Sequence, residues 1–161
     1  MSRLNARAII WLLPGRVEEK GVPAPKTALV VDDVAFARKV IKDILIDAKY
    51  TVVGEAANGA EAIALYKQLK PDFITMDVVM PVKSGIEAAR KIIEDDKNAK
   101  IIIVSAIVHE QVLMEAINAG ARDYIVKPFS AEDLLKAIDK ALQGMEEGEG
   151  MGARGAAYGA G

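Results

Sequence analysis

The 161-residue sequence contains no cysteine, which excludes disulfide bridges, thiolate metal sites, iron–sulfur clusters and a thiol nucleophile. Aromatic residues make up only 5% of the chain, so we expect an aliphatic core. Net charge is small, because 21 Lys and Arg residues oppose 23 Asp and Glu residues. This balance argues against a general nucleic-acid binder, which needs a strongly basic surface.

Long apolar runs are also missing. The longest candidate export segment, residues 8–13, ends at Pro14 and is far shorter than the roughly 20 apolar residues that cross a bilayer. No small-residue cleavage site of the kind found in signal peptides follows it. We therefore expect no membrane association and a location in the cytoplasm, a reducing compartment with which the absence of cysteine is compatible.

From Thr27 onward, short apolar runs alternate five times with longer segments of helical periodicity. The runs lack inside-outside alternation, which is typical of parallel strands covered by helices on both faces. Right-handed crossovers then predict a doubly wound, five-stranded parallel sheet with five helices. The expected strands are residues 28–31, 51–53, 73–76, 101–104 and 124–126.

The chain ends fall outside this pattern. Residues 1–26 contain an apolar patch at 9–13 and several prolines and glycines, which predicts an extension and linker before a domain at 27–143. Residues 144–161 are rich in glycine and predict a flexible tail. The apolar patch fits a docking segment, a flap on the domain, or translated sequence upstream of the true start.

Helix boundaries and faces are partly visible in the sequence. Asn58, Ser84 and Ser130 each stand where a side chain can cap a following helix. In the first helical segment, one apolar stripe should pack onto the sheet, formed by Val34, Ala37, Val40, Ile41, Ile44, Leu45 and Ala48. Arg38 is expected on the solvent side of that segment, and Glu55 is interpreted as an exposed charge on an edge strand.

Polar residues directly follow four of the five apolar runs, namely Asp32 and Asp33, Asp77, Ser105 and Lys127. Because the carboxyl ends of parallel strands meet at one edge of the sheet, we expect these side chains to converge. Two carboxylates about 4 Å apart repel by roughly 4 kcal/mol at an effective dielectric constant near 20, so the cluster predicts a bound Mg²⁺. Lys127 and Ser105 would suit a phosphate. The alternative is that each Asp merely caps the helix after its strand.

Four motifs carry a resemblance to a known family. They are Val30-Val31-Asp32-Asp33, Met76-Asp77-Val78-Val79-Met80-Pro81 with Ser84-Gly85, Ser105-Ala106, and Lys127-Pro128-Phe129. In this order and spacing they resemble the receiver domains of two-component response regulators, particularly the CheY-like single-domain type. The resemblance covers about residues 27–142 and implies a flavodoxin-like sheet of order 2-1-3-4-5.

The resemblance implies a role for each residue. Asp77 would be the phospho-acceptor, attacking the phosphorus of a kinase phosphohistidine or of a small donor such as acetyl phosphate. Asp33 and Asp77 would ligate Mg²⁺, with Asp32 acting mainly through a bound water and the backbone carbonyl of Val79 completing the protein ligands. Lys127 would help to neutralise the transferring phosphoryl group, and its bond to Pro128 is expected to be cis.

The resemblance also implies a switch. The Ser105 hydroxyl would move to the phosphoryl oxygen, and Tyr124 would rotate inward. The output face would comprise the fourth helix, fifth strand and fifth helix, with Leu113 as an exposed apolar contact. Val79 and Ile107, two residues after Asp77 and Ser105, are apolar where many fast-resetting relatives have polar groups, so we expect a long-lived acyl phosphate.

The resemblance implies a phosphorylation-activated response regulator with a sensor histidine kinase as its phosphodonor. No DNA-binding or enzymatic output domain follows, so we expect the chain to signal by protein contact. By analogy with the family we expect a monomer that acts in chemotaxis, with a flagellar switch protein or a phosphatase as partner. It would not be a turnover enzyme, although slow autodephosphorylation is compatible with the site. A phosphorelay intermediate and a phosphorylation-independent pseudo-receiver adaptor remain alternative interpretations.

Overall fold

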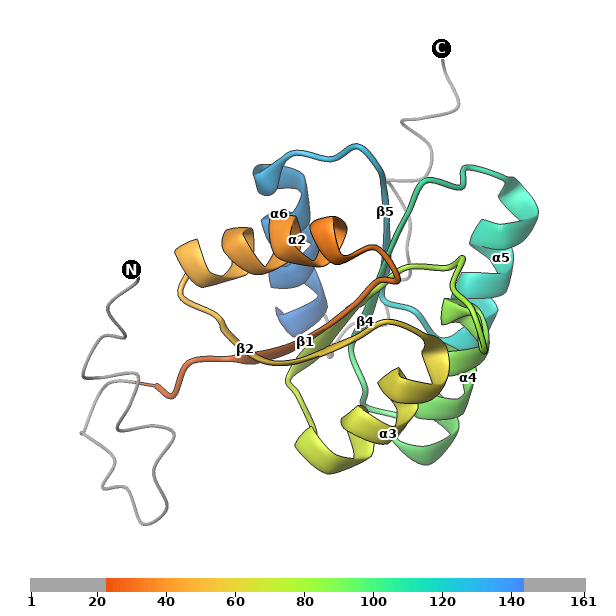
Figure 1. The fold of residues 1–161 in the computed structure, drawn as a ribbon, viewed down its shortest axis with the longest axis horizontal. Helices are drawn as coiled ribbons and strands as arrows, with labels where there is room; N and C mark the ends of the chain where they lie inside the picture. The colour runs from red at the N-terminus through yellow and green to blue at the C-terminus, as the bar shows by residue number, and fades with distance from the viewer. Residues whose placement is uncertain (1–22, 144–161) are drawn as a thin grey trace.

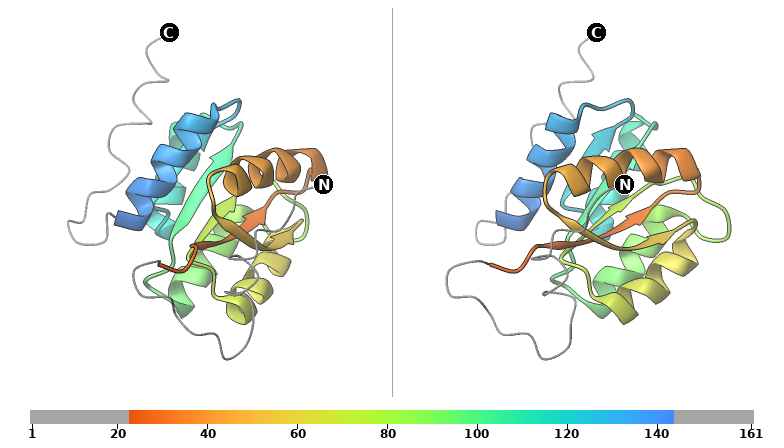
Figure 2. Two further views of the ribbon diagram at one scale, coloured as in Figure 1. Left: turned by 90° about the vertical axis from the view of Figure 1, so that its left-hand side faces the viewer. Right: turned by 60° about the vertical axis from the view of Figure 1, so that its left-hand side comes forward.

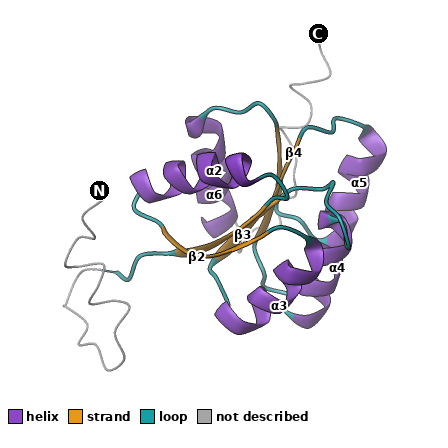
Figure 3. Cartoon of the chain, in the orientation of Figure 1, coloured by secondary structure: helices purple, strands orange, loops and turns teal. Residues whose placement is uncertain are grey.

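The computed structural model describes residues 23–143, in which strands and helices alternate along the chain (Figures 1 and 3). The predicted extension before residue 23, including the apolar patch at 9–13, and the predicted tail at 144–161 lie outside the described residues. The elements are β1 Thr27–Val31, α2 Ala35–Asp47, β2 Thr51–Ala56, α3 Gly59–Leu69, β3 Phe73–Met76, α4 Gly85–Asp95, β4 Ile101–Ser105, α5 Glu110–Ala119, β5 Asp123–Val126 and α6 Ala131–Gln143.

The described strands form one parallel sheet in the order β2-β1-β3-β4-β5, which confirms the predicted fold. The chain moves from β1 outward to β2, then crosses back to β3 on the other side of β1. The strand order therefore reverses between β1 and β3, and a doubly wound sheet forms its ligand site at the carboxyl ends of the strands at such a point.

Helices cover both faces of the sheet, as the views in Figures 1 and 2 show. Helices α3, α4 and α5 pack on one face, where Leu29 and Ile103 are among the buried strand residues. Helices α2 and α6 pack on the other face against the alternate strand residues, such as Val30 and Ile102. Each strand is thus buried on both sides, which explains why the strands lack polar alternation in the sequence.

The predicted helix caps are present. Asn58 accepts a hydrogen bond from the Glu61 amide at the start of α3, and Ser84 forms a capping box with Glu87 at the start of α4. The Ser130 hydroxyl likewise accepts from the Asp133 amide. These side chains satisfy backbone donors that have no partner within the first turn of a helix.

The predicted buried stripe of α2 is too wide. Only Ile41 and Leu45 of this helix are buried, whereas Val34 and Val40 are exposed. Helix α2 packs on β1 and the edge strand β2, so the sheet covers a narrow strip of its surface. In the described part of the chain, no helix is long and apolar enough to cross a membrane.

Candidate functional site

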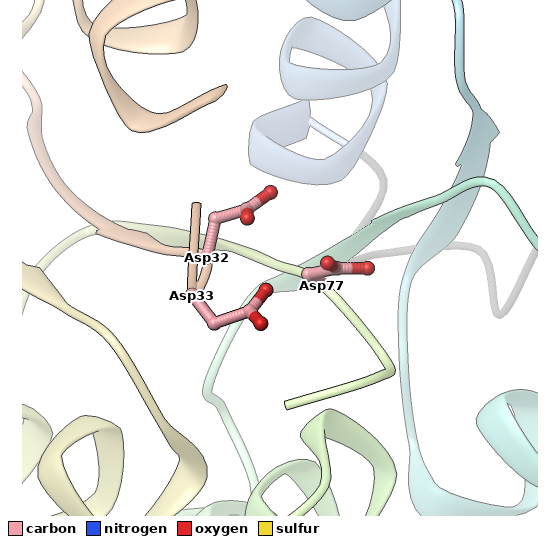
Figure 4. Close-up of side chains that lie close together, drawn as sticks. All are labelled: Asp32, Asp33 and Asp77. Atoms are coloured by element: carbon pink, nitrogen blue, oxygen red, sulfur yellow. The ribbon is translucent and has the colours of Figure 1, made fainter. Parts of the chain in front are cut away.

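Three carboxylates meet at the point where the strand order reverses (Figure 4). Asp32 and Asp33 follow β1, and Asp77 follows the neighbouring strand β3. One oxygen of each carboxylate lies within 4.8 Å of the others. Asp32 and Asp77 are buried, whereas Asp33 is exposed. The structure therefore brings together the three acidic residues that the sequence placed at one edge of the sheet.

Lys127 approaches this cluster from the end of β5. Its Nζ donates to Asp32 Oδ2 at 2.6 Å and lies 3.5 Å from Asp77 Oδ2. The Lys127–Pro128 peptide is cis, as the resemblance to receiver domains implies. A single partly buried cation thus faces two carboxylates, and it balances only part of the negative charge of the cluster.

The electrostatic environment disfavours the charged form of Asp77. Burial raises the pKa of Asp77, the nearby Lys127 opposes this rise, and the charges of Asp32 and Asp33 add to it. Asp77 Oδ1 also accepts a hydrogen bond from the Val78 amide at 2.8 Å, which stabilises the carboxylate. Because burial is the largest cause of this rise and the two carboxylates add to it, a bound cation would relieve an unfavourable charge arrangement.

The donor set fits Mg²⁺. This ion prefers hard oxygen ligands from one or two carboxylates and keeps several waters or phosphate oxygens. Asp33 and Asp77 offer such oxygens at the open side of the site, while Asp32 is already engaged by Lys127 and by the Val34 amide at 2.9 Å.

The loop after Asp77 is held close to the acidic cluster by tight backbone packing. The Gly85 amide donates to the Val78 carbonyl at 2.9 Å. A Cβ atom on Gly85 would lie only 1.8 Å from the Asp77 carbonyl oxygen, so only glycine fits this position without displacing the loop. The side chain of Val79 is exposed in the same loop.

Ser105 and Tyr124 lie on the adjacent strands β4 and β5. The Ser105 hydroxyl accepts from the Ile107 amide at 3.2 Å, and the Tyr124 hydroxyl donates to the Ile107 carbonyl at 2.7 Å. Tyr124 is 5% exposed, and burial raises its pKa. Tyr124 is therefore buried in this structure, with its hydroxyl held by the Ile107 carbonyl.

The expected exposure of Leu113 is wrong. This side chain is half-buried and packs against the core beneath α5. Met114 and Ile117 are the exposed apolar residues of the same helix. Because Tyr124 is buried and Leu113 is half-buried, the exposed apolar surface of α5 comes from Met114 and Ile117 rather than from the two residues predicted.

A model of the response regulator receiver domain matches residues 28–139 of the chain. The chain belongs to the response regulator receiver family. Phosphorylation by a kinase and Mg²⁺ binding at an acidic pocket are general features of this family, whose CheY-like members are signalling proteins rather than turnover enzymes.

The receiver is similar to chemotaxis proteins over most of their length. It is 50% identical to the chemotaxis protein CheY of Thermotoga maritima over 115 residues, which are 71% of this chain and 96% of that protein. It is 49% identical to CheY of Bacillus subtilis over 114 residues, 71% of this chain and 95% of the relative. Among solved structures, it resembles CheY in the CheX-CheY-BeF3-Mg complex of Borrelia burgdorferi, with a TM-score of 0.69 and 34% identity over 71% of this chain and 87% of that one.

Sequence reasoning missed the contacts between charged residues beside the receiver site. Arg38 was expected in solvent, but its side chain is only 18% exposed and contacts Glu55. Glu55 is exposed on the edge strand β2, as predicted, and it also binds both Arg38 and Lys42. Helical spacing could have indicated the position of Arg38, because it precedes Ile41 by three residues and Leu45 by seven and so shares their face.

Proposed function

We propose that the receiver accepts a phosphoryl group on Asp77 from a sensor histidine kinase in a Mg²⁺-dependent reaction. The supporting observation is the placement of Asp77 among two further carboxylates within 4.8 Å, with Lys127 Nζ at 3.5 Å. Such a cluster is costly for stability without a cation, and it presents both a nucleophile and a countercharge for a phosphoryl group.

In the proposed reaction, a carboxylate oxygen of Asp77 attacks the phosphorus of a phosphohistidine. The new P–O bond forms as the P–N bond breaks, and the electron pair of that bond leaves with the imidazole of the donor. Asp33, Asp77 and the backbone carbonyl of Val79 would hold Mg²⁺, with Asp32 contributing through a water. When bound, Mg²⁺ neutralises charge on the transferring group, and Lys127 supplies a further positive charge from the protein.

A protein phosphodonor is favoured by the apolar residues around the acidic site. Several exposed side chains follow the carboxyl ends of β1, β3 and β4, namely Val34, Phe36, Val79, Val82 and Val108. Exposed apolar residues around a site can form part of a protein contact surface. A small donor needs only the acidic centre, whereas a kinase domain would also contact this apolar rim.

Phosphorylation would be reported through protein contact on the α5-β5-α6 face. In this proposal the Ser105 hydroxyl binds the phosphoryl oxygen and stabilises the inward position of Tyr124. The exposed Met114 and Ile117 then form part of the surface that a partner contacts. The names of the relatives support a role in chemotaxis, and we propose a flagellar switch protein as the target. The output proposal predicts tighter binding of that protein to the phosphorylated chain than to the unphosphorylated chain.

The phosphorylation proposal is tested by intact mass spectrometry after incubation with acetyl phosphate, with and without Mg²⁺. We expect the native chain to gain one phosphoryl group only with Mg²⁺, and Asp77→Asn to gain none. Asp43→Asn is a matched control, because Asp43 is exposed on α2 and pairs with Lys39. A native chain that gains no mass, even with a purified cognate kinase, would contradict the proposal and support the adaptor interpretation.

A further inference from the structure

A charged cluster lies beside the acidic site and joins α2 to the edge strand β2. Arg38 Nε donates to Glu55 Oε1 at 3.1 Å, and Lys42 Nζ donates to Glu55 Oε2 at 2.9 Å. The two cations lower the pKa of Glu55, so this residue stays ionised at neutral pH. Glu55 is therefore a fixed negative anchor for two residues of α2.

Arg38 differs from Lys42 in having a second partner. Its Nη1 donates to the backbone carbonyl of Asp32 at 2.6 Å. A guanidinium is a rigid, planar group with several donors, so one side chain can hold two acceptors in a fixed relation. Arg38 thus connects the Glu55 carboxylate on β2 to the backbone of the loop that bears the acidic residues.

The Asp32 carbonyl belongs to the peptide unit that leads into Asp33. The other polar atoms of Asp32 are fixed elsewhere: its amide donates to the Ala56 carbonyl at 3.0 Å, and its carboxylate binds Val34 and Lys127. Because the peptide unit is planar, fixing the Asp32 carbonyl also fixes the direction in which the chain enters Asp33.

Asp33 needs this support more than the other two carboxylates do. Within residues 23–143, no hydrogen bond or ion pair holds its exposed side chain. Its position near Asp77 therefore depends on the backbone from which it projects. Residues that orient metal ligands without touching the metal commonly change metal affinity by about 10-fold to 100-fold when they are replaced.

We propose that Arg38 is a positioning residue for the metal site. Anchored on Glu55, its guanidinium holds the Asp32–Asp33 peptide so that the Asp33 carboxylate lies beside Asp77. This inference rests on the proposed function, because it assigns a determinant of the affinity of that same site for Mg²⁺.

The sign of the effect separates positioning from simple electrostatics. Arg38 is a cation close to a site for a divalent cation, so removing its charge alone should strengthen Mg²⁺ binding. Loss of positioning should weaken it. Lys42→Gln is the matched control. Like Arg38→Gln, it removes one positive charge and one contact with Glu55, but it removes no contact with the Asp32 carbonyl.

The experiment is a calorimetric titration of Mg²⁺ into the full chain at neutral pH. We expect Arg38→Gln to raise the dissociation constant about tenfold, Lys42→Gln to leave it unchanged or lower it, and Arg38→Lys to fall between the native chain and Arg38→Gln. Urea unfolding of each variant establishes that it is folded during the titration. The backbone amide resonance of Asp33 in the Mg²⁺-free protein should shift in Arg38→Gln and remain in place in Lys42→Gln.

Three results would overturn the inference. Arg38→Gln could bind Mg²⁺ as tightly as the native chain or more tightly, Lys42→Gln could weaken binding equally, or the Asp33 amide could be insensitive to Arg38→Gln. If Arg38→Gln does not fold, the Mg²⁺ affinity of Arg38→Lys is the test. Native affinity in Arg38→Lys would refute the inference, because a lysine cannot hold two acceptors in the way that a guanidinium does. A native chain that binds no Mg²⁺ would refute the proposed function itself, and this outcome is distinct from a variant-specific failure.

Discussion

Replacing Asp77 with Asn should stabilise the protein when Mg²⁺ is absent. One oxygen each of Asp32 and Asp33 lies within 4.8 Å of an Asp77 oxygen. At an effective dielectric constant near 20, a carboxylate at that limit repels Asp77 by about 3.5 kcal/mol, so the two together contribute about 7 kcal/mol. Lys127 at 3.5 Å attracts Asp77 by about 5 kcal/mol on the same scale. The net interaction energy of the Asp77 charge with these three groups is therefore unfavourable by about 2 kcal/mol. Solvent screening of the exposed Asp33 reduces this energy. We expect Asp77→Asn to gain about 1 kcal/mol in the free energy of unfolding.

The dependence on pH follows from the direction of the pKa shift. The pKa of Asp77 is raised in the folded protein, mainly by burial, so the folded state binds the proton more tightly than the unfolded state does. The unfavourable contribution of Asp77 is therefore absent well below its unfolded pKa and develops as the pH rises through the folded pKa. The advantage of Asp77→Asn should be largest at neutral pH and disappear in acid.

Urea denaturation at neutral and acidic pH, with and without Mg²⁺, measures both effects. At a Mg²⁺ concentration ten times the dissociation constant, the native chain should gain about 1.4 kcal/mol, and Asp77→Asn should gain less because it lacks one ligand. Asp43→Asn should respond to Mg²⁺ and to pH as the native chain does, because Asp43 lies outside the acidic site and the three carboxylates remain in place. The reasoning would be refuted if Asp77→Asn were less stable than the native chain at neutral pH without Mg²⁺, or if its advantage were the same in acid.

Three further predictions concern the reset of the switch, the loop and the core. Val79→Asn should shorten the lifetime of the phosphorylated chain, measured by the loss of phosphoryl mass after removal of the donor, because a polar side chain can orient the attacking water; a native half-life of seconds that this change leaves unaltered would contradict the reasoning. Gly85→Ala should lower the free energy of unfolding by more than about 2 kcal/mol in urea denaturation, because its Cβ would overlap the Asp77 carbonyl; a neutral effect would show that the loop relaxes freely. Tyr66→Phe removes a 2.6 Å hydrogen bond to Asp96 and should lower the free energy of unfolding by about 1 kcal/mol. The rate of phosphorylation by acetyl phosphate should stay the same, and a slower reaction would disprove a purely structural role for Tyr66.

Much of the site could be predicted because parallel strands end at the same edge of a sheet. Asp33 and Asp77 are 44 positions apart in the chain, yet each directly follows a buried apolar run, so the strand order alone places them side by side. Local rules were also sufficient for the helix starts at Asn58 and Ser84, where the capping interaction spans only three residues.

The surroundings of the site could not be predicted in the same way. Helical periodicity gave the faces of α2 but not how much of each face the sheet covers, and so Val40 was expected inside although it is exposed. Arg38 was expected in solvent but is partly buried against Glu55, because their pairing depends on how α2 lies over β2. The burial of Leu113 and of Tyr124 likewise depends on packing around α5 and on the hydroxyl contact of Tyr124 to Ile107.

The sequence by itself determined the alternation of strands and helices, the parallel sheet and the convergence of Asp32, Asp33, Asp77 and Lys127, because these follow from local periodicity and from the geometry of strand ends. Only the tertiary structure decided which charges around the cluster are paired and which apolar side chains remain exposed. Those outcomes depend on distances between elements that are remote in sequence, and a one-dimensional pattern carries no information about the depth to which a helix packs on its sheet.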